Sequence, residues 1–107
     1  MSDQVCCPTI VPVLDQPLLD QELATLCKAL SHPARVKLIR IMLAQSGCVG
    51  QDLVSALGLA QSTVSEHIRI LKEAGLVDAE NQRPKVCYSV NEAKLKRYQH
   101  LLADALG

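Results

Sequence analysis

The chain has 107 residues, enough for one domain with a single core and too few for two. Its 49% hydrophobic and 21% charged residues are typical of a folded globular protein, and its formal net charge of zero indicates no overall attraction to nucleic acid or membranes. Phe and Trp are absent and only two Tyr occur, so the core must be aliphatic, which favours packed helices.

No apolar run approaches the roughly 20 residues that span a bilayer, and the first residues lack the basic start of a secretory signal. We therefore expect a cytoplasmic protein with no membrane partner. Thiols stay reduced in that compartment. The five cysteines are accordingly interpreted as metal ligands, reactive thiols or core residues before structural disulfides.

The chain divides into an arm and a domain. Residues 1–15 are expected to form a flexible N-terminal arm, because two prolines keep this segment from regular structure. The arm carries two adjacent thiols, Cys6 and Cys7. Residues 16–107 are expected to form a single folded domain.

Leucines at spacings of four, three and four predict a first helix over 17–31. The pair His32-Pro33 breaks it, and Pro33 suits the first position of a second helix. Residues 34–43 are apolar on most sides, which is typical of a central core helix.

Five further elements complete the domain. A short helix within 50–58 and a longer helix over 61–74 each end at a glycine, whose freedom of backbone conformation suits a helix terminus. Alternating residues predict two strands, 76–80 and 85–90, joined by a turn. A last helix is expected over 92–106. The prediction is a mainly α protein: a winged helix-turn-helix of five helices with a two-stranded β-hairpin wing.

The second helix of a helix-turn-helix enters the major groove of DNA. When successive residues of the 61–74 helix are placed 100° apart on a helical wheel, one arc is apolar and the opposite arc is polar. The residues on the polar arc that we expect to face DNA are Gln61, Ser62, Ser65, Glu66 and Arg69. Any amphipathic surface helix has such a face, and the order helix, turn, helix, hairpin is what favours DNA. His67 lies on the apolar arc, so we expect it to be buried and hydrogen-bonded.

Charge is uneven along the chain in spite of its neutral total. Arg83 and Lys85 fall on the predicted wing, where a hairpin could touch DNA phosphates, although an ordinary solvated turn would carry the same charges. A dimer would double every basic site. The leucine stripes of the first and last helices hold more apolar surface than one small core can cover, which favours a homodimer.

The stretches "LCKALSHPARVKLIRIML", "LVSALGLAQSTVSEHIRILKEAGLV" and "KVCYSV" resemble the ArsR/SmtB family of metal-responsive repressors. The resemblance covers residues 20–106. It implies a homodimer that binds double-stranded operator DNA and releases it when a metal or metalloid ion binds. It also implies that Gln61, Ser62, Ser65 and the position of Glu66 face the bases. Members of the family often carry His where this chain has Glu66.

Cys48 stands just before the short third helix, where unpaired N–H groups and the helix dipole favour a thiolate. Many members of the family have Cys-Val-Cys here, and those cysteines bind the metal. Cys48-Val49 matches the first half, and Gly50-Gln51 replaces the second cysteine. This departure leaves one thiol where those members have two.

Cys6 and Cys7 can supply the two missing ligands. About ten residues separate them from the first helix, which reach up to roughly 33–36 Å when extended. Three thiolates fit trivalent arsenic or antimony, which form three bonds, whereas zinc usually takes four ligands. The predicted metal site is therefore Cys6, Cys7 and Cys48, with arsenite as the inducer. Cadmium, lead or zinc would need a further ligand.

The remaining candidates are assigned structural roles. Cys27 lies in the apolar arc of the first helix and is expected to be a buried core residue. Cys87 is expected to point away from the core with no pairing partner, outside the site. His100 and Asp104, four apart on the last helix, are interpreted as solvated surface rather than as a zinc site.

Three other functions compete with an arsenic-responsive repressor. A redox-sensing repressor would use a disulfide between Cys6 and Cys7, or between either of them and Cys48. A thiol enzyme needs an anion cradle beside its nucleophile, and "CCPTIVPV" contains no Arg, Lys, His or Gly, so we expect no enzyme and no small-molecule substrate. A protein-interaction module of the same fold would keep its structure without binding DNA.

Overall fold

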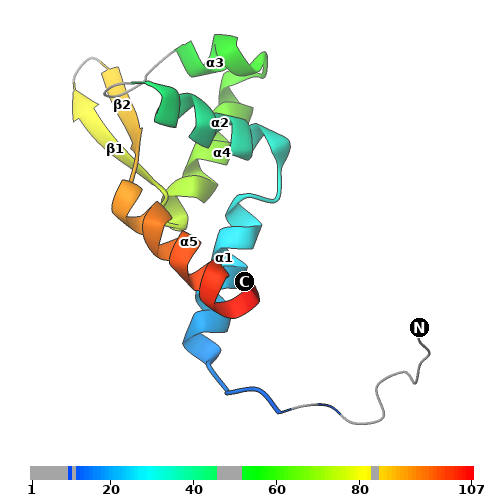
Figure 1. Ribbon diagram of the computed structural model, residues 1–107. Helices are drawn as coiled ribbons and strands as arrows, with labels where there is room; N and C mark the ends of the chain where they lie inside the picture. Colours follow the sequence, from blue (N-terminus) through cyan, green and yellow to red (C-terminus); the bar gives the residue numbers. More distant parts are fainter. Residues whose placement is uncertain (1–9, 11, 46–51, 83–84) are drawn as a thin grey trace.

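The computed structural model describes residue 10 and residues 12–45, 52–82 and 85–107 (Figure 1). Within these residues five helices and one hairpin follow in the order α1 (Pro17–Ala29), α2 (Pro33–Ala44), α3 (Asp52–Leu57), α4 (Gln61–Glu73), β1 (Val77–Gln82), β2 (Lys85–Val90) and α5 (Glu92–Leu106). The predicted winged helix-turn-helix is confirmed. The division between arm and domain stays a prediction, because residues 1–9 and 11 lie outside the described residues.

Prolines begin the first two helices. Pro17 and Pro33 occupy the first turns of α1 and α2, where a missing N–H costs no helical hydrogen bond. The Nδ1 atom of His32 accepts a hydrogen bond from the backbone N–H of Ala34 at 3.0 Å and caps α2. Helix α1 ends at Ala29, two residues before the predicted end, since Ser31 already belongs to the turn that carries this cap.

Two glycines shape the ends of the helix-turn-helix. Gly58, with φ of 65°, begins the short turn between α3 and α4, and Gly75, with φ of 79°, follows the end of α4. Both backbones lie in the left-handed region that side chains disfavour. The two predicted glycine helix ends are confirmed.

The wing is an antiparallel pair in which Val77 lies opposite Val90 and Gln82 lies opposite Lys85. The predicted first strand, 76–80, was wrong at both of its ends. Pairing continues through Gln82, so the connection between the strands is shorter than predicted, because cross-strand pairing stabilises polar residues that have little strand preference of their own.

The core is aliphatic apart from one tyrosine and draws on all five described helices and the start of β1. Its buried members are Leu26, Ala29, Leu38, Ile39, Met42, Leu53, Val64, Ile68, Leu71, Ala74, Leu76, Val77 and Tyr98. Helix α2 lies at its centre and contacts α3, α4 and β2. The expectation of a central core helix within 34–43 is confirmed.

Helices α1 and α5 lie side by side at the end of the molecule opposite α3 and the wing (Figure 1). Two hydrogen bonds from Arg97 to the carboxylate of Glu22, at 2.7 and 2.8 Å, join them. Leu18, Leu102 and Leu106 remain exposed on this pair of helices. The pair therefore keeps an apolar surface that the described part of the chain does not cover.

Candidate nucleic-acid interface

Helix α4 has one buried and one exposed side. Val64, His67, Ile68 and Leu71 are buried against the domain. The exposed side carries all of the residues that we expect to face DNA, namely Gln61, Ser62, Ser65, Glu66 and Arg69. Because α3 packs against α4 and α2 packs against both, the exposed side projects from a rigid support. The predicted division into buried and exposed arcs is confirmed except at Thr63, which the helical wheel places on the apolar arc and which is exposed. Contact of the exposed residues with DNA stays a prediction.

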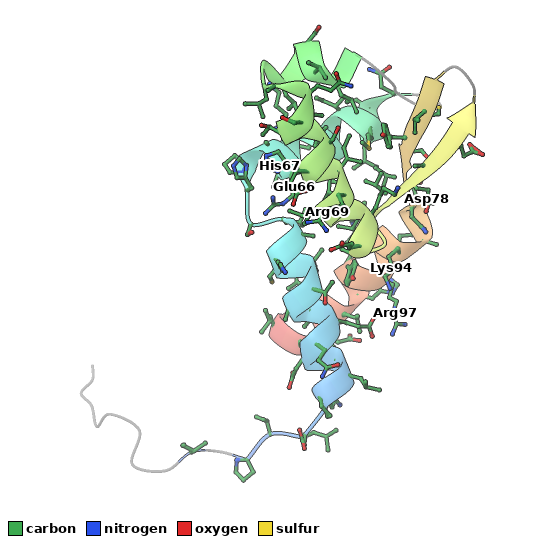
Figure 2. All side chains as sticks on the ribbon, turned by 180° about the vertical axis from the view of Figure 1, so that it is seen from behind. Glu66, His67, Arg69, Asp78, Lys94 and Arg97 are labelled. Carbon is green, nitrogen blue, oxygen red and sulfur yellow. The ribbon has the colours of Figure 1, made fainter. Side chains whose placement is uncertain are left out.

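Arg69 is held by two carboxylates of its own helix, Glu66 and Glu73; Figure 2 labels Arg69 beside Glu66. Its Nε and Nη2 atoms donate to Glu66 at 2.9 and 2.5 Å, and its Nη1 atom donates to Glu73. The hydrogen bond from Arg69 lowers the pKa of Glu66, and the two carboxylates raise the pKa of Arg69. These side chains are about half exposed, so water and salt weaken the pairs. A DNA phosphate would have to displace a carboxylate from the guanidinium.

Two basic residues were predicted on the wing, and the structure describes the backbone of one of them, Lys85. Lys85 begins β2 opposite Gln82, next to the connection at the hairpin tip. Arg83 lies outside the described residues. The backbone position of Lys85 agrees with a wing that could approach phosphates, and its contact with them stays a prediction.

A buried polar pair lies directly behind the exposed face of α4, and only one of its two residues was predicted from the sequence. Arg35 and His67 are 8% and 7% exposed, and the Arg35 Nη1 atom lies 3.0 Å from the Nδ1 atom of His67. The burial and hydrogen bonding predicted for His67 are confirmed. A signal for Arg35 was present, because it lies three and four positions before Leu38 and Ile39, on the buried stripe of α2. A charged side chain on a buried stripe needs a hydrogen-bond partner.

The pair fixes the chemical state of the histidine. An arginine side chain can only donate, so His67 Nδ1 accepts and the neutral ring carries its proton on Nε2. Burial lowers the pKa of His67, the charges of His32 and Arg35 lower it further, and Glu66 partly opposes them. The His32 ring is centred 4.5 Å from the His67 ring.

The structure places two of the five cysteines. Cys27 is an exposed, free thiol, so the prediction of a buried core residue was wrong. The reason is that α1 is buried at Leu26 and Ala29, and Cys27 lies outside that narrow stripe. The proposed ligands Cys6, Cys7 and Cys48 lie outside the described residues. Within the described ranges no three His, Cys, Asp or Glu side chains gather as a metal site would require.

Cys87, in β2, is disulfide-bonded. The prediction that it has no pairing partner was wrong, and so was the expectation that all five cysteines are reduced. Both rested on sequence position and compartment, which do not show which thiols the folded chain brings together. The residue is half-buried and lies opposite Glu80 in the wing.

The last helix carries no evident metal site. His100 and Asp104 are both exposed on α5, as expected of solvated surface residues. Among the described residues, no helix has the length and apolar character needed to cross a bilayer.

Comparisons with known proteins agree with this geometry. Residues 32–79 match the family described as bacterial regulatory protein, arsR family. The HTH-type transcriptional repressor SmtB of Mycobacterium tuberculosis is 33% identical over 101 residues, covering 94% of this chain and 71% of that protein. The HTH-type transcriptional regulator YgaV of Escherichia coli is 31% identical over 74 residues, covering 68% of this chain and 75% of that protein.

A solved structure has a similar fold. The crystal structure of the transcriptional repressor BigR from Xylella fastidiosa superposes with a TM-score of 0.64 at 26% sequence identity, covering 85% of this chain and 93% of that one. The two sequence relatives and this structure are all named as transcriptional regulators or repressors.

Proposed function

Because the chain belongs to the ArsR family and is a transcriptional regulator rather than an enzyme, we propose that it is a cytoplasmic, homodimeric repressor induced by trivalent arsenic. In this proposal the dimer binds operator DNA through α4 and the wing. It dissociates from the operator when trivalent arsenic, or antimony, binds Cys6, Cys7 and Cys48.

The exposed face of α4 is the observation that carries the DNA-binding part. It presents short polar side chains at its start and Arg69 further along, which allows close approach to base edges and phosphates. Glu66 can accept a hydrogen bond from a cytosine amino group. The exposed leucines of α1 and α5 support the dimer, because a two-fold operator needs two such helices held at a fixed spacing.

The chemistry of the donor set supports the inducer. In the reduced protein three soft thiolates suit an ion that forms three bonds, and no cluster of the described residues offers a competing site of three or more ligands. Cys48 precedes α3, whose packing against α2 and α4 connects it to the DNA-facing helix. A bound ion would therefore favour one dimer shape, and a coupling of about 1–3 kcal/mol would change operator affinity ~5–150-fold.

Arsenite titration of a protein–DNA complex tests the proposal. The probe is a duplex enriched by the reduced wild-type protein from a randomised library. Serine at Cys6, Cys7 or Cys48 should leave duplex binding intact and abolish its release by arsenite. Serine at Cys27, an exposed thiol outside the proposed site, is the matched control and should release normally. Normal release by Cys48→Ser would refute the three-thiol site.

The disulfide at Cys87 favours a second candidate, a thiol-based redox repressor. Peroxide would oxidise two thiols to one disulfide and be reduced to two molecules of water. Titrating the same complex with peroxide instead of arsenite separates the candidates. A redox repressor loses its response to peroxide in Cys87→Ser, whereas an arsenic-responsive repressor with that substitution still releases DNA in arsenite.

A further inference from the structure

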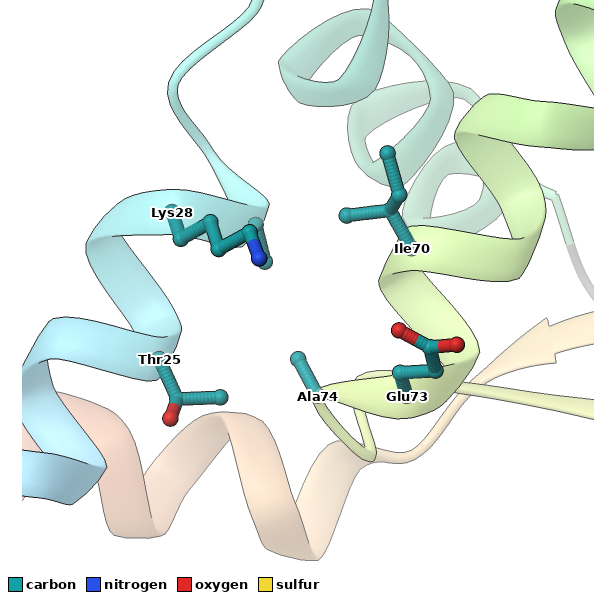
Figure 3. Close-up of a pocket in the computed structure, with 6 residues that line it drawn as sticks. Thr25, Lys28, Ile70, Glu73 and Ala74 are labelled. Atoms are coloured by element: carbon teal, nitrogen blue, oxygen red, sulfur yellow. The ribbon is translucent and has the colours of Figure 1, made fainter.

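Helices α1 and α4 are not packed tightly against each other. A cavity of about 220 Å³ lies between them, lined by Thr25 and Lys28 of α1 and by Ile70 and Glu73 of α4 (Figure 3). Interdigitated side chains would normally fix the relative position of two helices. Here much of the facing surface is open, so direct packing between α1 and α4 contributes little to their spacing.

The side chain of Arg35 supplies a direct link between the two helices. On one side its Nε atom donates to the carbonyl of Ala29 at 2.7 Å, and its Nη2 atom donates to the carbonyl of Lys28 at 3.3 Å and to Ser31 Oγ at 3.1 Å. On the other side its Nη1 atom reaches His67 of α4 at 3.0 Å. One buried guanidinium from α2 thus joins the end of α1 to the middle of α4.

The two sides of this bridge differ in strength. The carbonyls of Lys28 and Ala29 belong to the last turn of α1, where the helix dipole favours a cation. The Lys28 carbonyl also accepts from the backbone N–H and the hydroxyl of Ser31. This side makes three hydrogen bonds, two of them to those carbonyls. The His67 side makes a single hydrogen bond, and only while Nδ1 carries no proton. The bridge should therefore open at His67.

We propose that Arg35 is a positioning residue for DNA binding, which sets α4 relative to α1 through neutral His67, and that a proton on His67 opens the bridge and weakens operator binding. The proposal rests on the proposed function, since it requires that α4 reads the operator. His67 adjoins Glu66 and lies two positions before Arg69, so a shift of His67 moves the exposed face of α4.

The surroundings of His67 set the direction of the effect. The charged or titratable groups that act on it are His32 before α2, Arg35 on α2 and Glu66 on α4, and the pKa of His67 is lowered, chiefly by burial. The ring is therefore neutral at pH 7.5. A proton on Nδ1 would place two positive charges against each other at the present 3.0 Å contact.

The experiment measures operator discrimination against pH. The reduced wild-type protein first enriches a duplex from a randomised library at pH 7.5. Affinity for this duplex and for a shuffled duplex of equal length is then measured at constant salt from pH 7.5 down to the lowest pH at which circular dichroism shows the native fold. The ratio of the two affinities cancels the general gain in phosphate attraction as histidines become charged. We expect the wild-type ratio to fall by about fivefold or more.

Matched variants assign the effect to the bridge. His67→Asn offers an acceptor oxygen that cannot be protonated, and should flatten the profile. Arg35→Lys keeps the charge but loses the planar set of donors, and should reduce the ratio at pH 7.5 and flatten the profile. His100→Asn, at an exposed position of α5, is the matched control and should retain the wild-type profile. His32→Asn keeps a capping acceptor for α2 but removes a charge that lowers the pKa of His67, so its profile should shift to higher pH.

Nitrogen-15 spectra of the imidazoles in the wild-type protein give a readout that needs no variant. The midpoint of His67 protonation should coincide with the midpoint of the fall in discrimination. Different midpoints, or parallel profiles for wild type and His67→Asn, would overturn the inference and leave the proposed function standing. Failure to enrich any duplex at pH 7.5 would overturn the proposed function and the inference with it.

Discussion

The hydroxyl of Tyr98 joins α5 to the end of the DNA-facing helix, and its removal should destabilise the fold measurably. The hydroxyl donates to the carbonyl of Ala74 at 3.0 Å. Ala74 is the C-cap of α4, so its carbonyl is beyond the reach of helical N–H donors. Tyr98 is 2% exposed and Ala74 is 5% exposed. Water therefore cannot easily replace the hydroxyl in Tyr98→Phe.

The size of the effect follows from this burial. A typical hydrogen bond contributes about 0.5–1.5 kcal/mol, and an orphaned buried acceptor costs about 1–3 kcal/mol. We expect Tyr98→Phe to lose about 1–2 kcal/mol of unfolding free energy. With a slope of about 2 kcal/mol per M in urea, the midpoint should fall by roughly 0.5–1 M without a change in slope.

Urea unfolding followed by far-ultraviolet circular dichroism measures the loss, at one fixed protein concentration because the protein is expected to dimerise. Tyr88→Phe in β2 is the matched control, since Tyr88 is only half-buried and no hydrogen bond of its hydroxyl is found in the described part of the chain. Equal midpoints for wild type and Tyr98→Phe, or equal losses in the two variants, would refute the reasoning.

The same variant predicts a pH dependence. Burial raises the pKa of Tyr98 above its ordinary value of 10.0. A group whose folded pKa is raised contributes stability that is complete below the unfolded pKa and is lost as the pH rises through the folded pKa. The advantage of wild type over Tyr98→Phe should thus be constant up to about pH 9 and shrink above pH 10. An advantage that grows with pH would contradict this assignment.

Three further predictions concern the turns, the DNA-facing helix and the dimer. Gly75→Ala should lower the free energy of unfolding in urea by about 1–2 kcal/mol, because its φ of 79° strains a residue with a side chain. Gly58→Ala, with φ of 65° and open space around the new methyl group, should lower it by about the same amount. A much larger loss at Gly75 would mean that crowding, not backbone strain, decides there. Glu66→Gln removes one of the two carboxylates that hold Arg69, so the salt dependence of DNA binding should be steeper in this variant than in Arg69→Ala, by up to about 0.9 per subunit. Identical slopes in both variants would exclude phosphate contact by Arg69. Leu102→Glu on the exposed face of α5 should yield monomers in sedimentation, and a tight dimer would contradict an interface there.

The fold was largely predictable from the sequence because its signals are local. Leucine spacing, prolines at helix starts and glycines at helix ends depend on residues within one or two turns of one another. The apolar arc of α4 likewise predicted which side is buried, including His67. The Arg69 pairs with Glu66 and Glu73 are also local, at spacings of three and four, and could have been read from the same helical wheel.

What the sequence by itself determined is therefore the order of the elements and the side of α4 that faces outward, because periodicity within a segment sets both. Only the tertiary structure decided which distant groups meet. It exposed Cys27, although this residue borders an apolar stripe, and it placed Cys87 in a disulfide. It also brought Arg35 to His67, 32 positions away in sequence. Each of these outcomes depends on how α1, α2, α4 and the wing pack together, and a local pattern carries no information about the atoms that a side chain meets across such a contact.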